Sequence, residues 1–562
     1  MQSRCGDAIM NALASRAKEF SYLSSCAEHG VVSPTNRSHT RRVARAALVV
    51  MVFFVLSRAM GLLREIVIAR QFGTSAGLDA YLAAFRIPDL LFALMAGGAL
   101  GSALIPVLSD YLARDDERAA WKLTSAVLNW VVLAMGGAAA LAALAAPLLV
   151  RTVIAPGFTP AQQALTAELM RWMLLSTLIF GVSGIVMGIL NARQHFLLPA
   201  LAPAVYNVAI TLGAWLLGPA LGVHGAVIGV VAGAAAHLLV QLPALQQFNV
   251  RYWPRLAPHD PGVREVGRLM APRALGLAAV ELNHLVNVVL ASGLTAGSLA
   301  ALNYGRMMML LPEGIIAQSV AIAAFPTFSA LLARQEHAEM RRVFLTTLRS
   351  VLYLTLPATV GLILLREPLV VALLQRGAFD ARSSAATAWA LLFYALGLAS
   401  HAALEIITRA FYAARDTRTP VGVGVAAMIA NALLSLALMA LFRRLGWAPH
   451  GGLALANTLA TTAEMGVLLH LLHRRLGILS GAREMINALG RIALGCLVTV
   501  LTLLGANAAF AQAPAWLLCG LGIVLGGGMY ALTTMALRCD EPLALMRTLW
   551  SHARRYAPLH ES

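Results

Sequence analysis

Apolar stretches of membrane-spanning length dominate this sequence. A helix needs about 20 predominantly apolar residues to cross the hydrocarbon core of a bilayer. Of the 562 residues, 59% are hydrophobic and 12% are charged, which is too apolar for a single aqueous core. We therefore predict an all-α polytopic membrane protein with about fourteen transmembrane helices. They are expected at residues 46–68, 79–112, 122–149, 162–191, 197–219, 222–245, 264–291, 298–333, 343–364, 384–412, 419–441, 451–472, 487–507 and 515–537.

The sequence also repeats its own pattern about 220 residues further along. Six residues of the first copy share one offset with six of the second, in the pairs Gly73 and Gly293, Gly77 and Gly297, Arg86 and Arg306, Pro106 and Pro326, Ser109 and Ser329, and Arg114 and Arg334. An ordered series of this kind indicates gene duplication, and a unit of six helices returns the chain to the same side of the membrane. We predict two parallel six-helix lobes, residues 45–245 and 246–475, followed by two further helices within 476–540.

Charged residues outside the apolar stretches indicate the topology. The net charge of +17 comes from basic residues that lie between apolar stretches, not in a patch with interleaved aromatics, so nucleic-acid binding is not indicated. These residues concentrate in the even-numbered loops, and the positive-inside rule then places both termini in the cytoplasm. Residues 1–44 lack the apolar core of a signal peptide, so we expect a disordered cytoplasmic tail or a misplaced start codon. Residues 541–562 are expected to form a second cytoplasmic tail.

The sequence contains no pattern for a metal centre, a cofactor or catalysis. Its five cysteines show neither CxxC spacing nor a pairing logic, so neither a disulfide framework nor a metal site is predicted. An integral-membrane glycosyltransferase or polymerase would need large loops with convergent acidic or metal-binding residues, for example in a DxD or HExxH motif. The loops here are short and carry no such motif. We therefore expect a transporter, not an enzyme.

Charged residues at membrane depth are the candidates for function, because an arginine at the centre of a membrane helix costs about 2.5 to 3.5 kcal/mol. Where the two halves of a duplicated transporter face each other, such residues converge on a central water-filled cavity. The excess of arginine predicts an anionic substrate, since a guanidinium group can bind diphosphate oxygens in bidentate fashion. The candidates lie in the first two helices of each repeat and are Arg58, Arg64, Glu65, Asp79, Arg86, Arg273 and Arg306.

Some of these residues also admit a structural explanation. Arg58 and Arg64 lie on different faces of one helix. For both, a cavity role competes with snorkelling or with an internal ion pair, and Arg64 has Glu65 beside it. Asp79 fits equally well as part of a gate ion pair or as a helix cap. The sequence leaves these alternatives open.

Two further sets of residues carry similar alternatives. Arg86 and Arg306 belong to the duplicated motif, so they contact the substrate or serve a bend near the prolines that follow them. Asn283 and Asn287 lie one turn apart on one helix. They are candidates for binding substrate or an ion, and the alternative is hydrogen bonding between helices. Glycines and prolines in the charged helices predict points of bending.

The order and spacing of several motifs resemble one family of membrane transporters. The motifs cover about residues 45–540 and include Ser57-Arg58 with Gly61, Arg64-Glu65, Asp79-Ala80, Phe85-Arg86 with Pro88, Ala155-Pro156-Gly157-Phe158, and Asp416-Thr417 with Thr419-Pro420. They are similar to the lipid II flippase family MurJ, also called MviN, of the multidrug/oligosaccharidyl-lipid/polysaccharide exporter superfamily. The resemblance implies two six-helix lobes, a central cationic cavity and a lipid-facing groove formed by the last two helices.

The resemblance also implies a function. The family moves an undecaprenyl-diphosphate-linked muropeptide, the peptidoglycan precursor lipid II, across the bacterial inner membrane by alternating access. Arg58 and Arg64 would engage its head group, a coupling cation or the membrane potential would reset the carrier, and contacts with the cell-wall synthesis machinery are expected. Arg306 stands one residue before the position of the family's arginine, here Met307, so an altered substrate is also considered. The alternative is an exporter of another lipid-linked oligosaccharide or of a small molecule, although a drug-cation exporter should have an acidic cavity.

Overall fold

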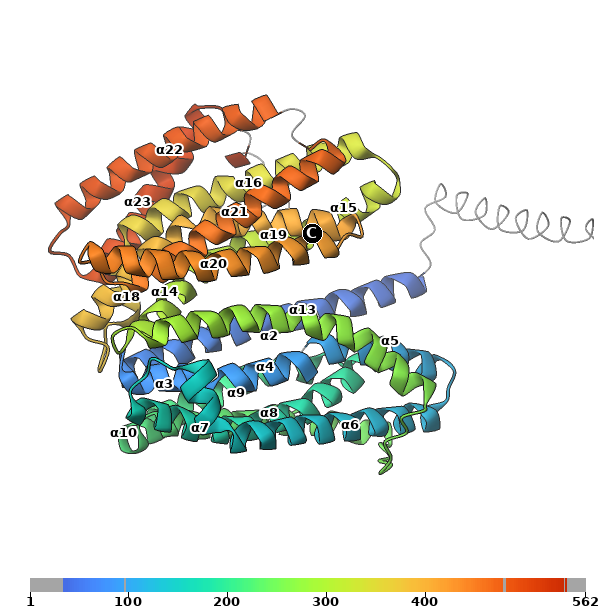
Figure 1. Ribbon diagram of the computed structural model, residues 1–562. Coiled ribbons are helices and arrows are strands. Elements are labelled where there is room, and N and C mark those ends of the chain that lie inside the picture. The colour runs from blue at the N-terminus through green and yellow to red at the C-terminus, as the bar shows by residue number, and fades with distance from the viewer. Residues whose placement is uncertain (1–33, 96–97, 479–481, 540, 543–562) are drawn as a thin grey trace, which may run out of the picture.

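The computed structural model describes residues 34–95, 98–478, 482–539 and 541–542 (Figure 1). Helices account for nearly all of these residues, and none of them forms a β-strand. The prediction of an all-α chain is therefore confirmed. Each of the fourteen predicted apolar stretches coincides with one helix or with consecutive helices that follow each other closely.

Long helices in the first half of the chain are interrupted at a few positions. The second predicted span is divided into three helices, and Pro88 stands in the first turn of the middle one, where the amide hydrogen that proline lacks is not needed. The elements in order are α2 (Pro34–Phe72), α3 (Ala76–Ala84), α4 (Arg86–Met95), α5 (Gly98–Ala113), α6 (Glu117–Leu144), α7 (Ala146–Leu149), η1 (Val150–Ile154), α8 (Pro160–Ala192), α9 (Leu197–Leu212), η2 (Gly213–Leu217), α10 (Gly218–Leu221), α11 (Val223–Leu239), α12 (Leu242–Leu245) and η3 (Gln246–Phe248).

The second half of the chain is also built of long helices with a few interruptions. Its second span is interrupted by a π-helical turn, η4, which begins two residues after Pro312. The elements are α13 (Pro261–Ser292), α14 (Ser298–Glu313), η4 (Gly314–Gln318), α15 (Ser319–Ala333), α16 (His337–Leu364), α17 (Arg366–Leu374), α18 (Ala381–Leu396), α19 (Leu398–Ala413), α20 (Arg418–Arg444), α21 (His450–Leu476), α22 (Ala482–Ala509) and α23 (Ala515–Ala536).

Most of these helices are suited to a membrane. Twelve continuous or broken helices among the described residues are long and apolar enough to cross a bilayer. The pair α18 and α19, bent by 45° at its junction, would be a thirteenth span. The helix α2 coincides with the first predicted span but is not among these twelve. The chain is thus a polytopic membrane protein, while the count of fourteen crossings stays a prediction.

The bounds of several helices carry the offset of the sequence repeat. Both ends of α16 lie 220 residues after the corresponding ends of α6, and α5 and α15 end at the same offset. In Figure 1 the helices of the first half form the lower group and α14 to α23 form the upper group, with α2 and α13 along the boundary. The helix α13, assigned by the sequence to the second lobe, packs against α4 and α5 of the first. The division into two parallel lobes stays a prediction.

The amino-terminal region differs in part from the expected disordered tail. The helix α2 begins at Pro34, so residues 34–44 are helical. A proline at the first helical position is already in the required conformation, and the arginines and alanines after it favour helix. Residues 1–33 and 543–562 of the two predicted tails lie outside the described residues.

The largest apolar cluster joins the two halves. It includes Leu78 and Tyr81 from α3 together with Tyr304 from α14 and Phe379 from the segment before α18. The rings of Tyr304 and Phe379 meet edge to face, with centroids 5.5 Å apart. The second half has a smaller apolar cluster of its own, and another smaller cluster joins Val266 of α13 to α5, α6 and α8 of the first half. The halves are therefore packed tightly together where this shared cluster lies.

Candidate functional site

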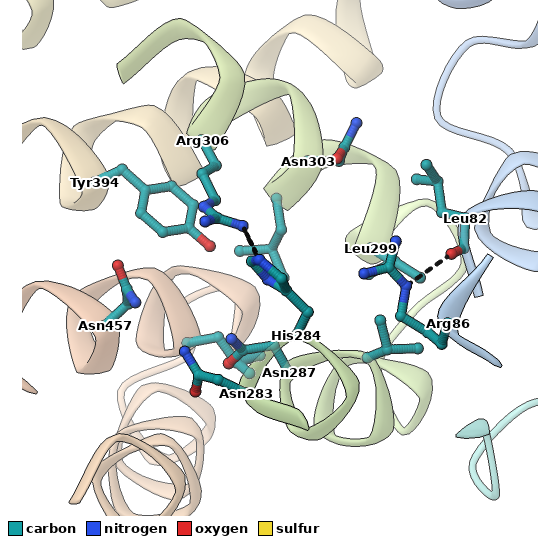
Figure 2. A pocket seen from close by; sticks show the side chains of 13 residues that line it. Leu82, Arg86, Asn283, His284, Asn287, Leu299, Asn303, Arg306, Tyr394 and Asn457 are labelled. Atoms are coloured by element: carbon teal, nitrogen blue, oxygen red, sulfur yellow. Dashed lines mark hydrogen bonds between the residues drawn. The ribbon is translucent and has the colours of Figure 1, made fainter. Parts of the chain in front are cut away.

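A polar pocket lies between the two halves (Figure 2). Leu82 and Arg86 from the first half form one wall, and the other walls come from α13, α14, α18 and α21. Its volume is about 90 Å³, well below the about 300 to 1,000 Å³ of pockets that hold drug-sized ligands. Of the predicted site residues, the structure brings Arg86, Asn283, Asn287 and Arg306 to this pocket.

Arg306 points into the pocket from α14. Its Nη1 donates a hydrogen bond to Nδ1 of His284, 3.0 Å away on α13. Because a guanidinium group can only donate, the imidazole nitrogen must accept, and His284 is neutral in this arrangement. Figure 2 also shows Tyr394 beside Arg306. The adjacent residue Met307 packs against the shared apolar cluster, so the arginine at position 306 is the one that faces the pocket.

Arg86 approaches the same pocket from the start of α4. Its Nε donates to the carbonyl oxygen of Leu82, 3.3 Å away (Figure 2). Its Nη2 lies 3.3 Å from Oδ2 of Asp89. These contacts hold the side chain near the break between α3 and α4. Arg86 therefore serves the bend and faces the pocket at the same time, so the two explanations offered by the sequence are compatible. Its role in binding a substrate stays a prediction.

Asparagines connect this pocket to a second one. Nδ2 of Asn431 on α20 lies 3.3 Å from Oδ1 of both Asn283 and Asn287, so these residues join α20 to α13. Asn283 and Asn457 line both pockets. The second pocket has a volume of about 650 Å³ and is mostly apolar. Arg273 lies there and not in the first pocket, so it is not brought together with Arg86 and Arg306.

Arg64 is engaged within the first half. Its Nη2 lies 2.5 Å from Oε1 of Glu65, and its Nη1 donates to Oδ1 of Asn207 on α9, 3.0 Å away. Asn207 also donates to the carbonyl oxygen of Ser57, 3.4 Å away. Arg64 and Glu65 thus form the internal ion pair that the sequence offered as the structural alternative. Arg58 is exposed on α2 and does not line the pocket between the halves.

Asp79 caps a helix of the opposite half. Its carboxylate is buried and accepts hydrogen bonds from the backbone amides of Gly297, at 2.6 Å, and Ala300, at 2.8 Å. These amides belong to the first turn of α14, whose positive dipole end also favours a carboxylate. The helix α3 has its own cap, Ser75. The sequence offered a gate ion pair or a cap on Asp79's own helix, whereas in the structure Asp79 caps α14 across the boundary and Ser75 caps α3.

Further contacts close the boundary at the end where Asp79 lies. Oγ1 of Thr74 donates to Oγ of Ser383, 2.9 Å away, and the amide of Thr74 donates to the same oxygen at 3.3 Å. The backbone amide of Ala378 donates to the carbonyl oxygen of Arg70, 2.8 Å away. Each of these bonds joins the loop after α2 or the end of α2 to the segment around α18. They leave the two halves in direct backbone contact.

Two glycines make this approach possible. Gly297 has φ of +89°, and a Cβ atom placed there would lie 2.2 Å from the carbonyl oxygen of Thr74. Gly377 has φ of +62°, and its Cβ atom would lie 2.4 Å from the carbonyl oxygen of Arg70. Both the conformation and the space exclude a side chain. We call the contacts made by Thr74, Asp79, Gly297, Gly377, Ala378 and Ser383 the sealed end.

Several residues of these sites were not singled out as site residues from the sequence. Asn207, Asn303, Tyr394 and Asn457 are polar residues within apolar stretches, which is the signal that could have indicated them. Ser383 offered no such signal, because serine is common at the start of a helix. Its role depends on a contact with a residue 309 positions away.

The chain is similar to a known protein family and to several of its members. The family described as "Lipid II flippase MurJ" matches residues 68–519. A "Probable lipid II flippase MurJ" of Vibrio cholerae is 29% identical over 471 residues, which are 81% of this chain and 87% of that protein. A protein of the same name from Synechocystis is 31% identical, over 80% of this chain and 85% of that protein. A "Lipid II flippase MurJ" of Burkholderia cenocepacia is 30% identical, over 72% of this chain and 79% of that protein.

Solved structures show the same fold. "Lipid II flippase MurJ, inward closed conformation" superposes with a TM-score of 0.73 at 24% identity, covering 87% of this chain and 98% of that one. An inward-facing multidrug transporter of the MATE family superposes with a TM-score of 0.63 at 15% identity, covering 77% of this chain and 99% of that one. The arrangement of helices is therefore shared with both of these transporters.

Proposed function

The chain belongs to the MurJ lipid II flippase family, and we propose that it carries lipid II, the lipid-linked precursor of peptidoglycan, across the bacterial inner membrane. The matched residues 68–519 include the whole of the predicted second lobe and all of the first after residue 67. The proposal describes a transporter, in which a head group is moved and no covalent bond is made or broken. Contacts with the enzymes that make and use the precursor are part of the same expectation.

The observation that carries the proposal is the meeting of Arg86 and Arg306 at one pocket. One arginine comes from each half, so a ligand bound by both would bridge the two halves. A guanidinium pair suits the diphosphate of the lipid-linked precursor, because each group can bind two phosphate oxygens. The asparagines of the same pocket offer amide groups suited to sugar and peptide groups.

The volume of the pocket supports a mechanism of alternating access. A space of about 90 Å³ cannot hold a diphosphate with its attached sugars, so the halves must separate before the head group can enter. The predicted topology places the sealed end on the outer side of the membrane. In this proposal the described conformation is closed to the outside. Release on the outer side then requires the contacts of the sealed end to open.

The energy source in this proposal acts on the charged residues of the same region. A charge that crosses the membrane field gains about 2.3 kcal/mol per 100 mV, so movement of Arg86 and Arg306 would respond to the membrane potential. A coupling cation is the second candidate. The buried side-chain oxygen of Asn431 is without a hydrogen-bond donor among the described residues, and a neutral oxygen of this kind is a ligand for a hard cation.

The export of another lipid-linked oligosaccharide is the alternative that the same pocket permits. Its arginines would bind any diphosphate or phosphate head group, and the sugar is selected by finer contacts. The paired arginines argue against a substrate that is a cationic drug, because like charges repel in a low-dielectric site. Complementation of a bacterium that lacks its own lipid II flippase distinguishes lipid II from another lipid-linked substrate.

The test is complementation of a bacterium depleted of its own lipid II flippase. The unchanged chain should restore growth and the appearance of the precursor at the outer leaflet. Arg306→Ala and Arg86→Ala should each lower this appearance about tenfold or more, since each removes a charged hydrogen-bonding group worth about 1.5 to 3 kcal/mol. The matched control is Arg444→Ala, which removes an exposed arginine at the end of α20 and should have no effect.

Each result has a distinct meaning. Rescue by the unchanged chain and by Arg444→Ala, with loss in both pocket variants, supports the proposal. A chain that reaches the membrane but never restores growth is not a lipid II flippase and would export another lipid-linked compound. Full rescue by both pocket variants would show that the substrate does not use this pocket.

A further inference from the structure

A second cationic site lies away from the central pocket, between α16 and α22. It is a groove with a volume of about 330 Å³. Six of its lining residues come from α16 and recur every three or four positions, so they form one face of that helix. These residues are Ala338, Arg341, Arg342, Leu345, Thr346 and Arg349, and Glu484 and Met485 of α22 line the opposite side. We call this site the α16–α22 groove.

Positive charge exceeds negative charge in this groove. It contains three arginines, and Glu484 is the only acidic residue among its described lining residues. Arg349 is paired with the buried carboxylate of Glu541. Arg342 has a weaker contact with Glu339, at 3.6 Å, and both side chains are exposed, so this pair contributes little. Arg341 has no acidic partner within the described part of the chain.

The position of these arginines favours an anion. The groove begins in the first turn of α16, where the positive end of the helix dipole adds to the arginine charges. Arg341 and Arg342 are adjacent, and their planar guanidinium groups can each offer two parallel donors to phosphate oxygens. Glu336 at the N-cap of α16 makes no side-chain capping bond, and its charge and that of Glu339 in the first turn offset part of this dipole, so the excess positive charge of the groove comes from its arginines.

The surroundings of the groove favour a lipid over a soluble anion. From the groove, α22 continues into a span with an exposed apolar face that includes Ile486, Leu494, Leu497 and Leu501. Ile486, next to the lining residue Met485, has 65% of its surface exposed. Figure 1 shows α22 at the outer edge of the molecule, with α16 on its inner side. A molecule with a phosphate head and an apolar chain would match both parts of this surface.

We propose that the α16–α22 groove binds the phosphate head group of an anionic membrane lipid, with Arg341 and Arg342 as the main ligands and the hydrocarbon chain along α22. Two lipids share this chemistry. One is an anionic phospholipid of the surrounding bilayer, and the other is the polyprenyl diphosphate part of the transported precursor. Binding of the polyprenyl diphosphate rests on the proposed function, whereas binding of a bilayer phospholipid does not.

Native mass spectrometry of the full-length purified protein tests this proposal. The probes are phosphatidylglycerol, zwitterionic phosphatidylcholine, undecaprenyl diphosphate and inorganic pyrophosphate. Two charges near a membrane surface are worth about 1 kcal/mol each, so Arg341→Ala combined with Arg342→Ala should weaken the binding of the anionic lipids about 30-fold. The double lysine variant at these positions keeps the charge and should retain most of the binding. The matched control is Arg264→Ala with Arg268→Ala, which removes two exposed arginines one turn apart on α13.

The outcomes distinguish between the two lipids, and they test the α16–α22 groove separately from the proposed transport function. Arginine-dependent binding of phosphatidylglycerol, of undecaprenyl diphosphate or of both supports the site, and the preferred probe identifies the source. The proposal is wrong if the alanine variant binds these lipids as the unchanged protein does, if the control loses as much binding, or if pyrophosphate alone is bound. Binding is measured without transport, so failure of the complementation experiment would leave this result intact.

Discussion

The carboxylate of Asp79 links the two halves of the molecule, because Asp79 belongs to α3 and accepts hydrogen bonds from backbone amides of α14. Removing it should open the sealed end. In Asp79→Ala, two hydrogen bonds to a charged acceptor are lost, each worth about 1.5 to 3 kcal/mol. We expect a cysteine placed at the buried position Ser298 to react at least about tenfold faster with a membrane-impermeant thiol reagent in this variant.

Ser75→Ala is the control for this experiment. It removes the side-chain cap of α3 itself, in which Oγ of Ser75 accepts from the amide of Leu78 at 3.2 Å. This change disturbs the same helix but leaves the bridge to α14 in place. Equal reaction rates in Asp79→Ala and the unchanged protein would show that the carboxylate does not hold the halves together.

For single residues, the sequence indicated which side chains have a special role better than it indicated the residues that they contact. Charged residues within apolar stretches indicated Arg86, Arg306 and Asp79 as special, because such residues need a reason to be there. Their partners come from distant parts of the chain, as with Arg64 and Asn207, which are 143 positions apart. No local pattern encodes such a pairing, and for this reason Asp79 as a cap of a distant helix could not be predicted.

The start of α14 depends on a glycine in a conformation that other residues avoid. Gly297→Ala should prevent the sealed end from closing, since its Cβ atom would collide with the carbonyl oxygen of Thr74. Gly222→Ala is a matched control, because Gly222 also has positive φ but open space around it. Both variants should lose about 1 to 3 kcal/mol of stability from backbone strain, measured by thermal unfolding. Transport should fail in Gly297→Ala alone.

The same experiment can contradict the assignment. If Gly297→Ala transports as well as Gly222→Ala does, the close approach at Thr74 is not required in the transport cycle. If both variants fail equally, backbone strain is sufficient to explain the loss.

At the scale of the element, apolar length determined where the helices lie but not where they break. The stretch 298–333 reads as one long span, yet it contains the π-helical turn η4. Pro312 and Gly314 indicate a weak point there. The type of irregularity depends on how the freed carbonyl groups find donors in the packed protein, as when Oγ of Ser319 bonds the carbonyl oxygen of Ile316 at 3.2 Å.

For the whole molecule, the alternating-access proposal predicts that a covalent link across the sealed end stops transport. Thr74 and Ser383 have side-chain oxygens 2.9 Å apart, so cysteines at both positions should form a disulfide bond. Oxidation of this double variant should abolish the appearance of the precursor at the outer leaflet, and a reducing agent should restore it. The measurement is the complementation assay with and without reductant.

A second pair of residues provides the control. Ser400 and Thr462 also have side-chain oxygens 2.9 Å apart, but both belong to the second half, on α19 and α21. A disulfide at this pair links two helices of one half and should leave transport unchanged. Continued transport with a complete Thr74 to Ser383 crosslink would contradict movement of the halves at this end.

The repeated pattern in the sequence was the strongest guide to the whole molecule. An offset of 220 residues in the sequence reappears in the bounds of α6 and α16, because equal loops and equal apolar lengths produce equal helices. The position of α13 was harder to predict from the sequence. The sequence assigns α13 to the second lobe, but its packing against α4 and α5 depends on the conformation in which the two halves meet.

The sealed end also determines whether ions can leak through the protein across the membrane. A bacterial inner membrane stores energy as an ion gradient, and a permanently open pore lined with arginines would discharge it through anions. The sealed end is closed by peptide groups, glycines and small hydroxyl side chains, with Asp79 buried behind hydrogen bonds. Backbone packing of this kind does not loosen with ionic strength, as exposed ion pairs do. The resting protein should therefore keep the membrane electrically tight over a wide range of salt concentrations.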